Sequence, residues 1–233
     1  IAVALENARL FAQTRQFATE LEGAVLQRTE ELQRERDSID FLYRLTSSLT
    51  TSLDINLTLN RALEMMVEAM DAEMGVILSI DSISENLTFR ATYNLPEEVG
   101  QDAGVSTRQG LAGWMIQSHQ SAVVPDVQRD YRWLQLGNWE NPPRSAIGAL
   151  LEANEDTLGV VILYHTQTDK FTDDQLRLLE AAATQIASAM NNADLYALIR
   201  EQAERLAAMV RREQVDSTKT LAIVDSIADG VMV

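Results

Sequence analysis

The sequence predicts an α+β fold, in which an antiparallel β-sheet is flanked by helices and a long coiled-coil helix lies at each end. Apolar patterns along the 233 residues follow the order helix, helix, hairpin, helix, strand, hairpin, helix. Residues 87–93 alternate apolar and polar side chains, as a half-buried strand requires. Both ends of the chain lack proline and carry apolar residues at heptad spacing, which indicates long helices.

The two end helices also resemble each other. Ile1–Leu21 aligns with Ile186–Leu206 without a gap, at an offset of 186 − 1 = 185, and ten of the 21 pairs are identical. Unrelated helices of this length would share about one to three residues. We therefore expect the sequence to start in the last helix of one domain, to cross a linker, and to leave a complete second domain by an equivalent linker.

The first half of the chain is predicted to form two helices and a hairpin. A helix over residues 1 to about 50 is followed by a second helix through about Asp71, which Asp54 is suited to cap. The buried side of this second helix is expected to hold Leu57, Leu63, Met66, Val67 and Met70. Strands follow at Met74–Asp81 and Leu87–Tyr93, with a turn at residues 84–86. The inward-facing residues of the second strand are expected to be Leu87, Phe89, Ala91 and Tyr93.

The second half is predicted to continue with a short helix at Gly110–Gln117, a strand at Ala122–Val124 and a long loop at Pro125–Pro143. A hairpin of Ser145–Glu152 and Leu158–His165 comes next, joined by a polar turn at residues 153–156. Thr172 is suited to cap the last helix, with Asp173 and Asp174 in its first turn. This helix is expected to continue to about Asp216.

Both end helices carry an apolar stripe at heptad spacing. In the first helix it comprises Phe11, Ala18, Leu21, Val25, Leu32, Ile39 and Leu42, with polar Thr14, Arg28 and Glu35 in the same rows. In the second it comprises Tyr196, Ile199, Ala203, Leu206 and Val210, with Glu213. An apolar stripe must be buried, so we expect a parallel homodimer in which the two copies meet along it. The alternative is that each stripe packs on its own domain or on a neighbouring one.

Composition excludes several classes of function. The net charge of −16 argues against nucleic acid as a partner, because a large cationic surface cannot be formed. The absence of cysteine excludes disulfides, thiolate metal sites, thiol nucleophiles and thioether-linked chromophores, and only two histidines are present to bind a metal. No stretch reaches the roughly 20 apolar residues of a membrane span, so we expect no membrane contact in this part of the protein and a cytoplasmic location.

Five local motifs, in order, resemble the GAF domain family. They are Gly110–Trp114, Val124–Val127 with Asp130 and Tyr131, Arg144–Gly148, Leu158–Leu163, and Phe171–Asp174 opening the helix through Tyr196. The resemblance implies a GAF/PAS-like fold. Ile1–Phe11 then resembles the end of a preceding GAF domain, and Leu221–Val233 resembles the start of a PAS domain. The expected division is a linker helix at 1–37, a GAF domain at 38–196, a signalling helix at 197–220 and the start of a PAS domain at 221–233.

The resemblance also implies a place for a ligand, between the sheet and the segments at Gly110–Gln117 and Pro125–Pro143. The candidate ligand-binding residues there are Tyr93, Trp114, Met115, Asp126, Tyr131, Trp133, Trp139 and Arg144. The alternative is that the aromatic side chains fill the core, and that Asp126 and Arg144 cap the loop and pair with each other on the surface.

Known ligands of the family are not favoured by this sequence. Covalent bilin attachment and methionine sulfoxide reduction both need a cysteine, and there is none. The cyclic-nucleotide pattern fails, because Asn154 is followed by Glu155 and because Gln175 and Leu176 stand where Asp-Glu is required. His119 and His165 are interpreted as surface histidines rather than haem ligands. We therefore expect no cofactor, with an unknown noncovalent ligand left open.

We expect this segment not to be an enzyme, because it has neither a glycine-rich phosphate loop nor a helix with a kinase acceptor histidine. GAF–GAF–PAS strings resemble the sensory half of bacterial histidine kinases, so the parent is expected to be such a kinase or another two-component enzyme. The expected function is a sensory or relay module that passes conformational change through dimeric linkers to a downstream output domain. The alternatives are a ligand-free structural spacer and a noncovalent small-molecule receptor.

Overall fold

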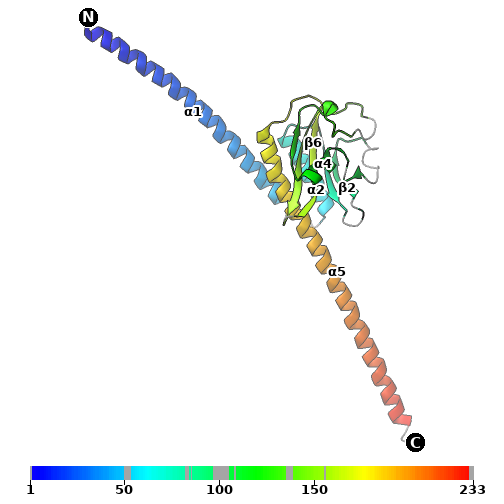
Figure 1. The fold of residues 1–233 in the computed structure, drawn as a ribbon. Coiled ribbons are helices and arrows are strands. Elements are labelled where there is room, and N and C mark those ends of the chain that lie inside the picture. Colours follow the sequence, from blue (N-terminus) through cyan, green and yellow to red (C-terminus); the bar gives the residue numbers. More distant parts are fainter. Residues whose placement is uncertain are drawn as a thin grey trace.

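The computed structural model describes residues 2–49, 54–81, 84, 86–96, 105–107, 109–134, 139–154 and 156–230. A domain in the middle of the chain is built on an antiparallel sheet, and two long helices, α1 and α5, extend from it in opposite directions (Figure 1). The described strands form a six-stranded sheet in the order β3-β2-β1-β6-β5-β4, which confirms the predicted α+β architecture. Within the described residues no helix combines the length and the apolar character needed to cross a membrane.

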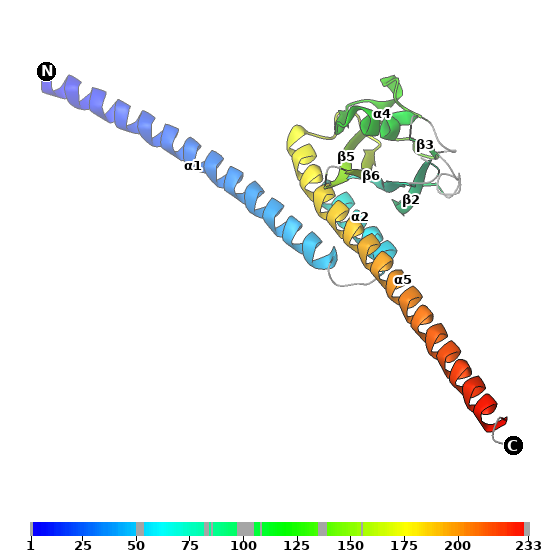
Figure 2. The ribbon, with the colours of Figure 1, turned by 60° about the horizontal axis from the view of Figure 1, so that its bottom comes forward.

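The helices α1 (Ala2–Leu49), α2 (Ile55–Ala69) and α5 (Asp173–Gly230) meet at one face of the sheet (Figure 2). The end of α1 belongs to this layer, since Leu45 is fully buried and the Thr46 hydroxyl lies 3.5 Å from Oε1 of Gln185 on α5. Further toward the N-terminus, α1 leaves the domain, and its stripe residues Leu21, Val25, Leu32 and Ile39 are exposed in the single chain.

The N-terminus of α2 is set by Asp54, whose side chain accepts hydrogen bonds from the backbone N–H groups of Asn56 and Leu57, as predicted. The prediction that Leu57 is buried was wrong, since 63% of it is exposed. Two residues along a helix correspond to a rotation of about 200°, so Leu57 points away from the face on which Leu59 is buried. The buried residues of α2 are Thr58, Leu59, Ala62, Leu63, Met66 and Val67.

The strands are β1 (Met74–Ile80), β2 (Asn86–Tyr93), β3 (Val105–Ser106), β4 (Ala122–Val124), β5 (Ser145–Ala153) and β6 (Asp156–His165). A bulge interrupts the pairing of β1 with β2: Ile77 is opposite Ala91, whereas Leu78 is opposite Phe89. Arg90 is therefore the extra residue, and the residues on its two sides face opposite ways. The predicted single inward face of β2 was wrong for this reason.

Two apolar cores lie on the two faces of the sheet. One contains the buried side chains of α1, α2 and α5 together with Ala91 and the half-buried Tyr93. The other lies under α4 (Gly110–Ser118) and contains Leu87, with Phe89 packed against it. Since each face is covered by helices, β1 and β6 read as nearly continuous apolar runs.

The β5–β6 hairpin is tighter than predicted, because the strands extend to Ala153 and Asp156 and Asn154 takes a positive φ of 51°. The cap of α5 is as predicted: the Thr172 hydroxyl accepts from the Gln175 N–H at 3.3 Å, and the Gln175 side chain accepts from the Thr172 N–H at 3.0 Å. The predicted end of this helix near Asp216 was wrong. It runs on to Gly230, since no proline or glycine interrupts it earlier.

Candidate functional site

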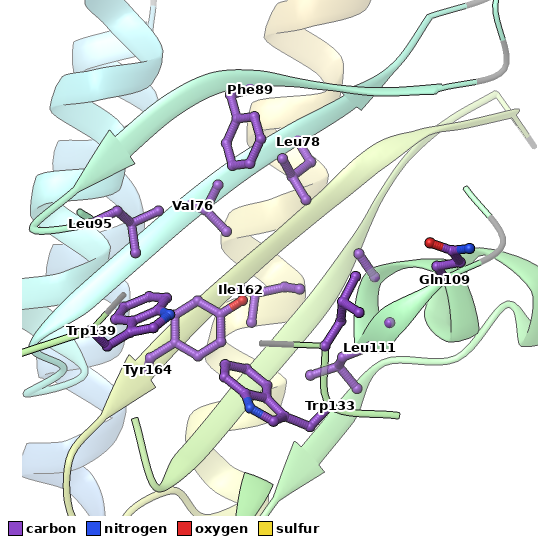
Figure 3. A pocket seen from close by; sticks show the side chains of 13 residues that line it. Val76, Leu78, Phe89, Leu95, Gln109, Leu111, Trp133, Trp139, Ile162 and Tyr164 are labelled. Atoms are coloured by element: carbon purple, nitrogen blue, oxygen red, sulfur yellow. The ribbon is translucent and has the colours of Figure 1, made fainter. Parts of the chain in front are cut away.

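A small apolar cavity lies between the sheet and α4, with a volume of about 50 Å³. Its walls come from the sheet side, the start of α4 and the loop that follows β4, and none of the lining side chains is charged (Figure 3). The lining residues are Val76, Leu78, Phe89, Leu95, Ile162 and Tyr164 of the sheet side, Gln109–Ala112 at the start of α4, and Trp133, Leu134 and Trp139 of the following loop. A water molecule occupies about 10–15 Å³ on this scale, so the cavity has room for a few small atoms.

Three aromatic rings form one wall of the cavity. The Tyr164 ring meets Trp133 edge-on at a centroid distance of 6.0 Å, and it meets Trp139 in the same manner at 6.3 Å (Figure 3). Such arrangements are the favoured ones for aromatic pairs. Burial raises the pKa of the Tyr164 hydroxyl above its usual range, so this group stays an uncharged hydrogen-bond donor.

The start of α4 forms another wall of the cavity. Gly110 has a φ of +71°, a conformation that side chains with a β-carbon rarely adopt. A β-carbon at this position would also lie 3.2 Å from Cβ of Leu134. The glycine therefore lets the first turn of α4 approach the loop that carries Trp133.

A second, polar cluster lies outside the cavity. The Arg132 guanidinium binds Asp130 through two hydrogen bonds of 2.8 and 2.6 Å, and it stacks over the Trp114 ring at 4.2 Å. Hydrogen bonding to Arg132 lowers the pKa of Asp130, and the same contact raises the pKa of Arg132. Trp114 is thereby covered by a cation and does not line the cavity.

A further ion pair is formed between Asp126 and Arg144. Two guanidinium N–H groups of Arg144 donate to Asp126 at 3.3 and 3.0 Å, and Asp126 also caps the short 3₁₀ helix η1 (Val127–Arg129) by accepting from the Gln128 N–H. The hydrogen bond from Arg144 holds the pKa of Asp126 below its usual value. The pair lies beside the cavity rather than in it, as the alternative of a loop cap and a surface pair requires.

Three further candidates lie elsewhere. Tyr93 packs in the core on the opposite face of the sheet, because the bulge at Arg90 turns it away. Met115 is fully buried on the inner side of α4, where a β-carbon placed on Gly148 would lie 2.8 Å from its sulfur. Tyr131 is 87% exposed. Of the eight candidate ligand-binding residues, Trp133 and Trp139 line the cavity.

Sequence reasoning missed Tyr164, which connects both tryptophans. The available signal was the alternation within β6, since Ile162 and Tyr164 face the cavity while Val161 and Leu163 face the opposite core.

The two histidines differ from each other. His119 is exposed and ends α4 with a φ of 51°, as expected of a surface residue. The interpretation of His165 as a surface residue was wrong, because only 6% of it is exposed. It ends the central strand β6, and its ring lies against Glu73 and the backbone N–H of Gln167. Within the described residues there is no group of three or more histidine, aspartate or glutamate side chains placed to hold a metal ion.

The comparisons with known proteins agree with this geometry. The family model described as "GAF domain" matches residues 52–191. Among solved structures, the GAF domain of a phosphoenolpyruvate-protein phosphotransferase from Coxiella burnetii has a TM-score of 0.64 at 14% identity, covering 70% of this chain and 98% of that one. The corresponding domain from Acinetobacter has a TM-score of 0.61 at 18% identity, covering 67% and 94%.

A free methionine-R-sulfoxide reductase from Neisseria meningitidis, in complex with its substrate, has a TM-score of 0.60 at 15% identity, covering 68% of this chain and 91% of that one. At these identities the similarity concerns the fold. No curated protein shows significant sequence similarity to the chain.

Proposed function

The chain belongs to the GAF domain family over residues 52–191, and from this we propose that the domain relays conformational change between the helices that enter and leave it. GAF domains are common sensory and signalling modules. The proposal adds a direction of transmission, from α1 and the domain core to the far end of α5.

One observation carries the proposal: α5 is both part of the domain core and the exit from the domain. Leu179, Ala183 and Ile186 are fully buried against the sheet, and the same helix continues without a break to Gly230. Leu45 near the end of α1 is buried in the same core. A shift of the sheet or of its packing therefore has to move both helices or strain their contacts, because close-packed cores do not deform gradually.

We propose further that two copies associate in parallel along the apolar stripes. Leu21, Val25, Leu32, Ile39, Tyr196, Ile199 and Leu206 are each between 52% and 75% exposed in the single chain, and Ala203 is exposed as well. Such a stripe on an isolated helix would leave large apolar areas in water. Leu42 differs, because it is half-buried against the core of its own domain. The side chains of Phe11, Ala18 and Val210 lie outside the described residues.

The relay can be tested with spin labels, because a chain without cysteine accepts single labels at chosen sites. Cysteine substitutions at Glu22 and Gln202 would report the distance between the two copies on α1 and α5. Ala183→Val adds two methyl groups between α5 and the sheet, so we expect it to change the distance at Gln202. The control, Glu180→Gln, alters an exposed position of the same helix. An unchanged distance in an intact Ala183→Val dimer would favour the ligand-free spacer.

A second candidate function, a noncovalent small-molecule receptor, is favoured by the uncharged cavity beneath Trp133. Its walls suit a small neutral molecule that accepts a hydrogen bond from Tyr164. A thermal-shift screen with such fragments tests it, since a ligand at 100 times its Kd adds about 2.7 kcal/mol. Trp133→Ala should abolish the shift, whereas Tyr131→Ala should not. The absence of any shift would leave the relay without a ligand.

The repeated helix supports a wider context for the relay. Ten identities between Ile1–Leu21 and Ile186–Leu206 suggest a preceding GAF domain, and residues 221–233 are proposed to lead into a PAS domain of a sensor kinase. Residues 221–230 are helical, and residues 231–233 lie outside the described part of the chain. Sequencing of the flanking regions would decide between this arrangement and any other.

A further inference from the structure

The connection between β6 and α5, residues 166–172, is where the sheet passes into the exit helix. Several contacts hold it in place. The Asp169 N–H donates to the Pro125 carbonyl at 2.9 Å, Lys170 pairs with Asp71, and the Ser145 hydroxyl donates to the Gln167 carbonyl at 2.6 Å. His165, the last residue of β6, is buried directly beneath this connection.

The contacts of His165 indicate which ring nitrogen carries the proton when the ring is neutral. Nδ1 lies 2.9 Å from the Gln167 backbone N–H, which can only donate, so Nδ1 must carry a lone pair. The proton of the neutral ring is therefore on Nε2. That atom lies 3.6 Å from Oε1 of Glu73, in the segment between α2 and β1.

The charged groups around His165 are mostly acidic. Glu73 faces Nε2, and its other oxygen accepts from the Thr166 N–H at 3.0 Å. Asp71 follows α2, and the hydrogen bond from Lys170 holds its pKa below the usual value. Arg144 immediately precedes β5; its backbone N–H donates to the His165 carbonyl, while its guanidinium is bound by Asp126.

We propose that protonation of His165 is an input to the relay. A proton taken from solvent binds Nδ1, which becomes a donor and faces the donor N–H of Gln167, so the hydrogen bond between them is lost. The imidazolium then pairs with Glu73, which charge favours. Protonated His165 thus loses its hydrogen bond to Gln167 in the connection and pairs more strongly with Glu73, so the connection has one contact fewer ahead of the cap of α5. This inference goes beyond the relay by adding a signal, and it does not depend on dimerisation.

The test is a pH titration of the full chain by NMR between about pH 5 and pH 8, the interval in which histidine usually changes charge. The His165 ring nitrogens and the Gln167 amide should change with one midpoint, and the amides of Thr172 and Gln175 should follow it. In the protonated form the Gln167 amide should exchange with solvent about fivefold faster relative to its intrinsic rate, as expected for the loss of one hydrogen bond.

Two variants distinguish the effect of His165 protonation from a general effect of pH on the protein. His165→Asn places a non-titrating oxygen where it can accept from the N–H two residues on, so Gln167 should stay protected at every pH. His119→Asn removes the exposed histidine and should leave the wild-type titration unchanged. The proposal is overturned if the Gln167 amide does not follow the His165 ring, if it responds equally in His165→Asn, or if the α5 cap amides stay constant.

Discussion

Gly159 on β6 and Leu78 on β1 approach so closely that a β-carbon on the glycine would lie 2.0 Å from the Leu78 carbonyl oxygen. Gly159 is paired on its other side with Leu151, next to a shift in the β5–β6 register. The obstacle is backbone, which cannot rotate away as a side chain can. The central strands of the sheet therefore depend on a position with no side chain.

Gly159→Ala should lower the free energy of unfolding by about 3 kcal/mol or more, because the backbones of β1 and β6 must separate. The matched control is Gly23→Ala on the exposed part of α1, where a β-carbon meets nothing within 4 Å. That change should stabilise the helix by about 0.5–1 kcal/mol. Urea denaturation of both variants measures the contrast, and similar values for the two would contradict the close approach of the strands.

Leu45→Ala should destabilise the domain by about 2–5 kcal/mol, because it leaves a cavity where α1 meets the core. Arg44→Ala, at the exposed neighbouring position, should change stability by less than about 0.5 kcal/mol. Denaturation curves monitored by tryptophan fluorescence would measure both. If the two variants are equally stable, the end of α1 is not part of the core.

Asp130→Asn should lower stability near neutral pH by about 1–2 kcal/mol, because Arg132 loses its charged partner and its position over Trp114. The pKa of Asp130 is depressed in the folded state, so its contribution is present above the unfolded pKa and is lost as pH falls through the folded value. The difference between wild type and variant should therefore vanish in strong acid. A difference that persists below about pH 2 would point to another cause.

Sedimentation equilibrium at micromolar concentration should give about twice the chain mass of 25.9 kDa. Val25→Asp puts a carboxylate on the apolar stripe, and its burial in each copy should cost several kcal/mol per dimer. Gln27→Asp adds the same charge to the same turn off the stripe, and should leave the mass unchanged. If Val25→Asp and Gln27→Asp weaken the dimer equally, the interface lies on another face of the helix. If the wild-type chain is a monomer at every concentration, the parallel dimer is ruled out.

Local chemistry made much of the fold predictable. The starts of the helices capped by Asp54 and Thr172 could be predicted, because a capping side chain binds backbone N–H groups within three residues of it in sequence. The strands follow from alternation and apolar runs of the right length. The end of α5 was predicted wrongly because the sequence contains no capping residue or helix breaker before Gly230. Without such a signal a helix extends cooperatively, and its end cannot be read from local sequence.

The site was less predictable, because it depends on how distant strands pair. Strict alternation along β2 placed Tyr93 on the same face of the sheet as Leu87 and Phe89. The bulge at Arg90 breaks this alternation, so Tyr93 lies on the opposite face. Trp133 and Trp139 were identified as aromatic residues of a loop. Tyr164 contacts both of them, but it lies in a strand that is apolar on both faces, so the sequence does not show which residues face the cavity. The neighbours of buried His165 include Glu73 and its strand partner Ser145, which lie far from it in sequence.

The length of α5 beyond the domain determines how far its end moves when its base tilts. Among the described side chains of α5, Met190 is the last in the core, and the 230 − 190 = 40 residues that follow span about 60 Å at 1.5 Å per residue. If the helix pivots rigidly, a tilt of about 5° at that base displaces the far end by about 5 Å, the rise of one helical turn. A change of core packing that tilts α5 by only this angle would thus displace its far end enough to change which residues meet there.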